Sequence, residues 1–222
     1  FSFLKGAIMA AVPTGTLFSV ATTFGSNITV TAVTNANPAV CTATAHGLSN
    51  GDIIEVTSGW GRANKRVFRV ANVATNTFEL EGFDTSSTSF FPAGTGIGTV
   101  REVTAWTQLT KVMNPATQGG EPKTVVYKFV ESDVEYSIND GFTATSYTLE
   151  FDDDDTTAGY TAMRTLTDAQ TNTVMKMLMR SGAILYLPCT LAMNDVPRLQ
   201  DGQINRISAS FAGVNRHTRY SA

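Results

Sequence analysis

The sequence predicts a mainly β protein, built as a β-sandwich with one flanking α-helix and an inserted small β-barrel-like module. Runs of about five residues rich in Val, Ile, Thr and Phe recur along the chain, and polar residues alternate with the apolar ones. Turns that contain Gly, Asn or Asp separate these runs, as they do in antiparallel hairpins. Helical periodicity is confined to one segment, which follows an acidic tract.

The first 27 residues are predicted to contain an N-terminal arm and the first strand of the sandwich, at 17–26. The apolar run at the start is too short and too interrupted for a membrane span or a secretory signal. We interpret it as an arm that docks on another subunit, because its apolar side chains would cause aggregation if they stayed exposed. A disordered end is the alternative. The arm residues are Phe1, Phe3, Leu4, Ile8, Leu17 and Phe18.

Residues 28–101 are predicted to form the inserted module. Strands at 53–57, 66–70 and 77–80 are separated by short turns. Cys41 lies in an alternating strand, without a helix N-terminus or a basic cluster near it in sequence, so we expect a buried structural thiol. Trp60, between two glycines, is expected to plug the core of the module, with a sugar-stacking platform as the alternative. The Gly-rich run at 94–98 lacks the Lys of a phosphate loop and is expected to connect strands.

Residues 102–222 are predicted to form the sandwich itself. Strands are expected at 101–112, 123–130 and 147–151, with a weaker strand or bend at 136–138. The sequence NPATQGGEP at 114–122 is rich in turn residues, and we expect it to be a projecting loop. Its candidate contact residues are Asn114, Pro115, Gln118 and Glu121.

One helix is expected near 156–169, where apolar residues recur four apart. Four acids precede it: Asp152, Asp153, Asp154 and Asp155. The simplest interpretation is a solvated turn in which Asp155 or Thr156 caps the helix. A calcium site is disfavoured because contiguous aspartates point in different directions.

The segment after the helix fits two structures. Residues 170–182 can extend the helix, since Met and Leu are good helix formers. They can also form a strand, and Ser181-Gly182 favours a hairpin with a two-residue turn. A last strand is expected within 202–214, followed by a short polar tail at 215–220.

Composition limits the classes of function. The 222 residues can hold one large domain or two small ones, and the formal charge of −3 lacks the basic excess of a protein that grips nucleic acid. Two cysteines are too few for a disulfide framework and favour folding in the cytosol. His46 and His217 have neither a metal-ligand spacing nor a neighbouring nucleophile motif. The sequence therefore predicts no enzyme, no catalytic residue, no metal and no cofactor.

Two segments resemble known families. The first, HGLSNGDIIEV…NKRVFRVANVATNTFELEG, resembles a small β module that recurs in tail proteins of double-stranded DNA bacteriophages. A similar pattern is known from the first catalytic-cysteine half-domain of ubiquitin-activating enzymes. The second comprises YTLEFDDDDTTAGYTAMRTLTDA, MRSGAILYLPCTL and DGQINRISASF. It resembles the tail tube (major tail) protein of long, non-contractile-tailed phages, which has a tail-tube-type β-sandwich.

The second resemblance implies a structural subunit of a virion tail, assembled in the host cytoplasm. Its partners would be further copies of itself, in stacked hexameric rings, and other tail proteins at the tube ends. Double-stranded DNA would pass through the tube without specific binding, and no membrane is involved. The four aspartates are then candidates for the lumen wall, because acidic or neutral walls let DNA slide. A host-surface or glycan-binding module on a virion scaffold, or a capsid decoration protein, are the alternatives.

Overall fold

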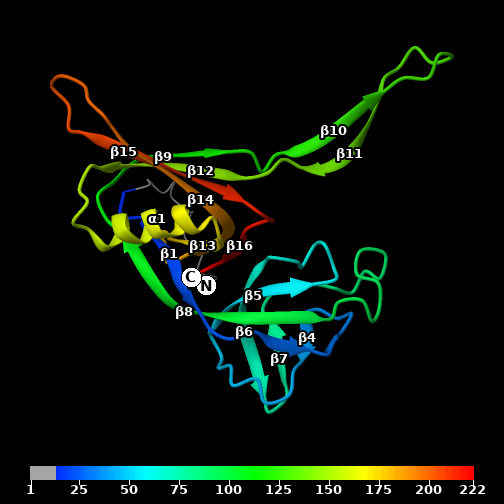
Figure 1. Cartoon of the computed structure of the whole chain (residues 1–222). Coiled ribbons are helices and arrows are strands. Elements are labelled where there is room, and N and C mark those ends of the chain that lie inside the picture. Colours follow the sequence, from blue (N-terminus) through cyan, green and yellow to red (C-terminus); the bar gives the residue numbers. More distant parts are fainter. Residues whose placement is uncertain (1–13) are drawn as a thin grey trace, which may run out of the picture.

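The computed structural model describes residues 14–222, and it shows a mainly β molecule with one α-helix in the described part of the chain (Figure 1). The predicted fold class is confirmed. The first eight strands are β1 (Leu17–Phe24), β2 (Ile28–Val30), β3 (Ala32–Val33), β4 (Ala39–Thr42), β5 (Ile53–Ser58), β6 (Val67–Ala74), β7 (Thr77–Leu80) and β8 (Gly98–Leu109). The elements that follow are β9 (Val112–Gln118), β10 (Pro122–Tyr127), β11 (Tyr136–Phe142), β12 (Ser146–Asp152), α1 (Ala158–Ala169), β13 (Asn172–Leu178), β14 (Ile184–Arg198), β15 (Arg206–Gly213) and β16 (Thr218–Tyr220).

One curled antiparallel sheet runs through most of the molecule. Its order is β3-β4-β7-β6-β5-β8-β1-β13-β14-β15-β12-β9, with β2 added to β8 and β16 to β14. Strands β10 and β11 pair only with each other. The sheet therefore contributes to two lobes, and β8 is common to both (Figure 1).

The large lobe has its core inside the curl formed by β1, β13, β14, β15 and β12. Alternate side chains are buried along each strand, such as Leu185, Leu187 and Cys189 on β14, as expected where one face is covered. Helix α1 packs on β14, β8 and β1 and buries Met163 in this core. A Cβ on Gly159 would lie 3.1 Å from the Gln108 carbonyl oxygen, so this glycine lets the helix approach β8 closely.

Helix α1 confirms the predicted helix, but the predicted cap was wrong. Its N-cap is Thr157, whose hydroxyl oxygen accepts a hydrogen bond from the Tyr160 amide at 3.2 Å. Thr156 and Asp155 lie before the cap, where the chain has not yet entered the helix. The next segment resolves to the hairpin β13–β14, as favoured. The Met179 amide donates to the Ala183 carbonyl, so three residues form the turn instead of two, with Gly182 at φ 84°.

The small lobe comprises β2 to β7 and the first residues of β8. Its core is a separate cluster around Phe68, Phe78 and Trp60. Cys41 is buried in it as a free thiol, as expected, and Trp60 is 2% exposed, which confirms the plug and excludes the sugar platform. Residues 92–97 connect strands, as predicted for the Gly-rich run.

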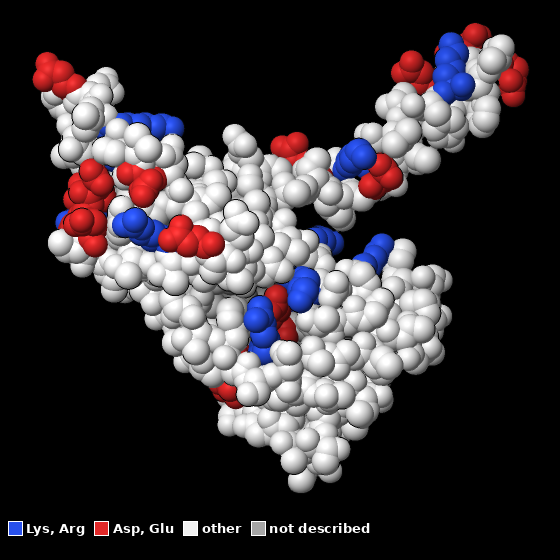
Figure 2. Space-filling view, viewed as in Figure 1, with Lys and Arg blue, Asp and Glu red and all other residues white. Residues whose placement is uncertain are grey.

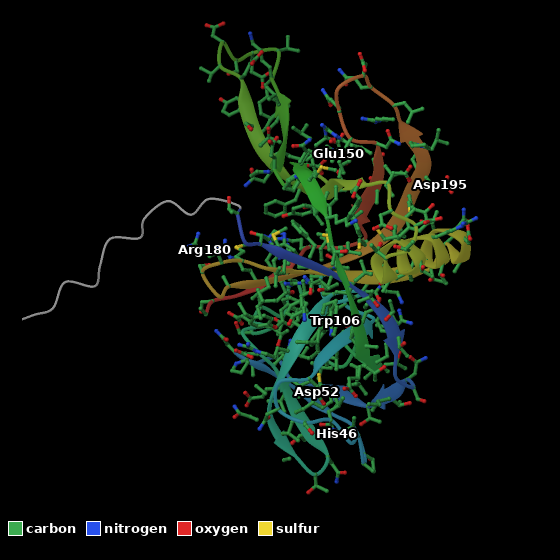
Figure 3. All side chains as sticks on the ribbon, turned by 90° about the vertical axis from the view of Figure 1, so that its left-hand side faces the viewer. His46, Asp52, Trp106, Glu150, Arg180 and Asp195 are labelled. Atoms are coloured by element: carbon green, nitrogen blue, oxygen red, sulfur yellow. The ribbon has the colours of Figure 1, made fainter. Side chains whose placement is uncertain are left out.

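A third cluster joins the two lobes and includes the C-terminus. Val103 of β8 and Tyr186 of β14 pack there with Val67 of the small lobe. Trp106 is partly buried and packs against the same cluster (Figure 3). The predicted polar tail is instead strand β16, which pairs with β14 and buries Tyr220. The Tyr220 hydroxyl oxygen accepts a hydrogen bond from the Arg69 amide at 2.8 Å, so strand β16 connects the small lobe to the large one.

Candidate assembly surfaces

The hairpin of β10 and β11 projects away from both lobes (Figure 1). Every residue of both strands is exposed. Most of the exposed large apolar side chains of the described chain lie on it: Val125, Val126, Tyr127, Phe129, Val130, Val134, Tyr136, Ile138 and Phe142. An isolated two-stranded hairpin is marginally stable in water, and an apolar surface of this kind marks a contact site.

The hairpin is held in shape by its own side chains. Tyr127 stacks on Tyr136 with ring centroids 5.6 Å apart, and Phe129 lies 5.4 Å from Tyr127. Lys123 forms a salt bridge to Asp140 at 2.8 Å, and this pairing raises the pKa of the Lys123 ammonium. These contacts preorganise the hairpin without burying it.

The predicted loop at 114–122 was wrong, since most of it is strand β9 and the start of β10. Strand β9 pairs with β12 along its length, and Asn114 adopts a positive φ of 44° at the register shift. Pro115 is tolerated because β9 is an edge strand. Gln118 and Glu121 lie at the base of the projecting hairpin and are exposed.

Asn114 is engaged inside its own subunit. Its side-chain amide donates to the Glu150 carboxylate at 2.9 Å, and Arg198 and Arg206 lie 3.4 Å from the same carboxylate (Figure 3). The hydrogen bond from Asn114 and then the charge of Arg206 lower the pKa of Glu150. This network connects β9, β12, β14 and β15 on one face of the sheet.

The predicted arm divides into two parts. Phe1, Phe3, Leu4 and Ile8 lie outside the described residues. Leu17 is 44% exposed at the start of β1, whereas Phe18 is only 4% exposed because it packs in the core of the large lobe opposite Met177. Including Phe18 in a docking arm was therefore wrong.

The four aspartates lie where β12 leads into α1. The Lys111 ammonium lies 2.6 Å from Asp154 and 3.3 Å from Asp152. Lys111, with hydrogen bonds from Thr156, lowers the pKa of Asp154 to about 2. Asp153 and Asp155 are exposed. Within residues 14–222, no three His, Cys, Asp or Glu side chains gather closely enough to hold a metal ion.

A second projection lies between β14 and β15. Val196, Leu199 and Ile204 are exposed there, near Asp195 and Asp201 (Figures 1 and 3). The sequence reasoning did not single out either projection. The sequence did contain a signal for the first projection, the β10–β11 hairpin, because KTVVYKFV places apolar residues on both faces of a strand.

The residues with possible chemistry have structural partners. His46 is buried, its Nδ1 accepts from the Leu48 amide at 3.1 Å, and its Nε2 lies 3.0 Å from the Ala74 carbonyl oxygen. Burial raises the pKa of both cysteine thiols, Cys41 and Cys189, to about 12. Burial, followed by the charges of nearby arginines, lowers the pKa of His217.

None of the helices in the described chain combines the length and apolar character that a membrane span requires.

Comparison with protein families matches the chain to the phage tail tube protein (TTP) family over residues 58–222. The match begins at the end of β5, so it includes part of the small lobe and all of the large lobe except β1. No curated protein matches the chain. Because the match covers most of the chain, the protein belongs to the phage tail tube protein family and is a structural subunit of a phage tail.

Proposed function

We propose that this subunit assembles into rings of six copies, which stack into a tube that conducts double-stranded DNA. The β10–β11 hairpin carries this proposal. Its strands are exposed on both faces and contribute no side chain to the three buried clusters. A hairpin of this kind becomes stable when a neighbouring copy covers it.

The sheet supports ring formation through its open edge. Among the described strands, β9 pairs on one side only, with β12. Unpaired strand edges invite pairing with another chain, and joining the sheets of several copies removes the edges. Head-to-tail contacts between successive rings then extend the assembly into an open tube.

We propose that the contacts between rings come from the hairpin, from its base and from the N-terminal arm. Pro115, Gln118 and Glu121 remain exposed at or near the base of the hairpin and are available to a neighbouring copy. Asn114 is exposed as well, and its side-chain amide donates to the Glu150 carboxylate of its own subunit. Leu17 is the described arm residue that stays accessible.

The lumen is proposed to be weakly acidic or neutral, so that DNA slides through it. Asp153 and Asp155 are exposed and available for its wall, whereas Asp152 and Asp154 are held by Lys111. The formal charge of −3 agrees with transport without tight binding. Other tail proteins would close the two ends of the tube, and assembly would take place in the host cytoplasm.

The small lobe is proposed to be an external β module with no catalytic role. Its resemblance to the half-domain of ubiquitin-activating enzymes stays a prediction. The Cys41 thiol is buried and its pKa is about 12, so it is protonated at neutral pH and is a poor nucleophile.

Electron microscopy of the purified protein tests the proposal. Concentrated protein is expected to form rings or regular tubes, with six-fold symmetry in end views. A chain that stays monomeric at high concentration, or that forms only trimers, would contradict it and favour a decoration protein instead.

A further inference from the structure

A groove lies at the base of the β10–β11 hairpin. Residues 142–145 and 213–216 line it, and its volume is about 250 Å³. Phe142 and Val214 expose 51% and 43% of their surface there, although both are apolar. The Arg216 guanidinium carbon lies 4.2 Å from the centre of the Phe142 ring. The groove thus combines an apolar floor with a cation.

More arginines surround this groove, because Asn215 ties it to the small lobe. The Asn215 side-chain amide donates to the carbonyl oxygens of Gly61, at 3.1 Å, and Asn64, at 2.6 Å. These bonds hold the 61–64 turn of the small lobe beside residue 215, and the Arg66 guanidinium donates a hydrogen bond to the Thr218 hydroxyl oxygen at 3.3 Å. Figure 2 shows basic side chains gathered where the hairpin and the two lobes meet.

These arginines carry uncompensated positive charge. In the part of the chain that the structure describes, Arg62, Arg66, Arg216 and Arg219 form no salt bridge. Burial, with the charge of Arg216, lowers the pKa of Arg66 to about 10, and Arg66, Arg216 and Arg219 all lower the pKa of His217. Glu81 of the small lobe is already paired with Arg69. The surface therefore fits an occupant that is both apolar and acidic.

The tip of the hairpin, residues 128–135, has this chemistry. Phe129, Val130 and Val134 are 52%, 102% and 63% exposed. Glu131, Asp133 and Glu135 stand between or beside them, against a single Lys128. Because the hairpin extends away from its own groove, the tip is presented to another copy (Figure 1).

We propose that the hairpin tip of one subunit docks into the arginine-lined groove at the hairpin base of a neighbouring copy. The apolar side chains of the tip cover Phe142 and Val214, and its carboxylates lie beside Arg216, the arginine that lines the groove. This proposal rests on the proposed tube assembly and names the two surfaces that meet in it. Opposite charges at such a contact fix the register and the partner.

A charge-exchange experiment on the full-length chain tests the docking. Arg216→Glu in the groove and Asp133→Lys at the tip both change exposed residues. Each is expected to raise the protein concentration needed for tube formation by about tenfold, since like charges then face each other. The double variant is expected to return to within about threefold of the wild-type value, because the reversed charges attract again.

The controls separate docking from folding and from assembly itself. Arg164→Glu makes the same charge change at an exposed position of α1 and is expected to assemble like the wild type. If Arg216→Glu only loosened its contact with Phe142, Asp133→Lys would not rescue it. Two results would overturn the docking while leaving the proposed tube assembly intact. In the first, the wild type forms tubes but the double variant does not recover assembly. In the second, Arg216→Glu assembles as well as Arg164→Glu. A wild-type chain that forms no tube would overturn the proposed function first.

Discussion

At the scale of single residues, Trp60 and Glu55 are used for packing and pairing inside the protein. The Trp60 indole donates to the Pro92 carbonyl at 2.9 Å and contacts the Phe91 ring at a centroid distance of 5.2 Å. A Cβ on Gly96 would lie 2.7 Å from the indole, so the glycine is required for this packing. Glu55 is 2% exposed and forms a salt bridge to Arg101 on the neighbouring strand.

Truncating the buried tryptophan tests its structural role. Trp60→Ala is expected to lower the free energy of unfolding by about 3–5 kcal/mol, because it leaves a cavity in the core of the small lobe. Phe90→Ala removes a ring of the same lobe that is 53% exposed, and is expected to cost less than about 1 kcal/mol. Urea denaturation measures the free energy of unfolding of both variants, and equal losses would contradict the structural role of Trp60.

The ion pair at Asp154 predicts a dependence on pH. Lys111 holds the pKa of Asp154 at about 2, below its ordinary value of 3.8. A depressed folded-state pKa stabilises the protein above the ordinary pKa, and this stability is lost as pH falls through about 2. Lys111→Met is expected to raise the pKa of Asp154 toward 3.8, as measured by NMR titration, and to weaken the acid dependence of stability. Lys128→Met is the control, and an Asp154 pKa that stays near 2 in Lys111→Met would refute the pairing.

At the scale of elements, the helix cap can be located by mutation. Thr157→Ala is expected to destabilise the protein by about 1 kcal/mol, because the Tyr160 amide loses its acceptor. Asp155→Ala, at the position that the sequence favoured, is expected to change stability by less than about 0.5 kcal/mol. Thermal unfolding compares the two variants, and the reverse order would place the cap at Asp155.

The hairpin is expected to be needed for assembly and dispensable for folding. Residues 121–142 can be replaced by Asn-Gly, since the Gly120 amide already donates to the Thr143 carbonyl at 3.2 Å. The shortened chain is expected to keep its Tm within about 4 °C, because the hairpin adds nothing to the buried clusters, and to form no tubes. The full-length double variant Phe129→Ser/Val130→Ser is likewise expected to form no tubes. Tubes from the shortened chain would contradict this role.

The elements bounded by clear turn signals could be predicted from the sequence. Apolar runs between turns located β5, β6, β7 and β15, and the four-residue spacing located α1. Strand β9 could not be predicted from the sequence, because Asn114 and Pro115 indicate a turn locally. Only its pairing with β12 makes this segment a strand. Strand β16 was missed for the same reason, since its partner β14 is distant in sequence. The groove at the hairpin base likewise depends on residues that the fold brings together from 142–145 and 213–216.

At the scale of the whole molecule, the described surface has two unlike regions. Acidic side chains gather at the hairpin tip and at the end of the large lobe near α1, whereas basic side chains, with acidic ones among them, gather between the lobes (Figure 2). Unlike regions on one subunit favour head-to-tail contacts, which build an open tube instead of a closed dimer.

Hydrogen–deuterium exchange of residues 122–142 tests the central claim most directly, because it reports whether neighbouring copies cover the hairpin. In dilute monomer these amides are expected to exchange rapidly, since every residue of both strands is exposed. In assembled protein they are expected to become strongly protected, while the amides of buried β13 are protected in both states. A hairpin that exchanges equally fast in monomer and assembly would contradict the account.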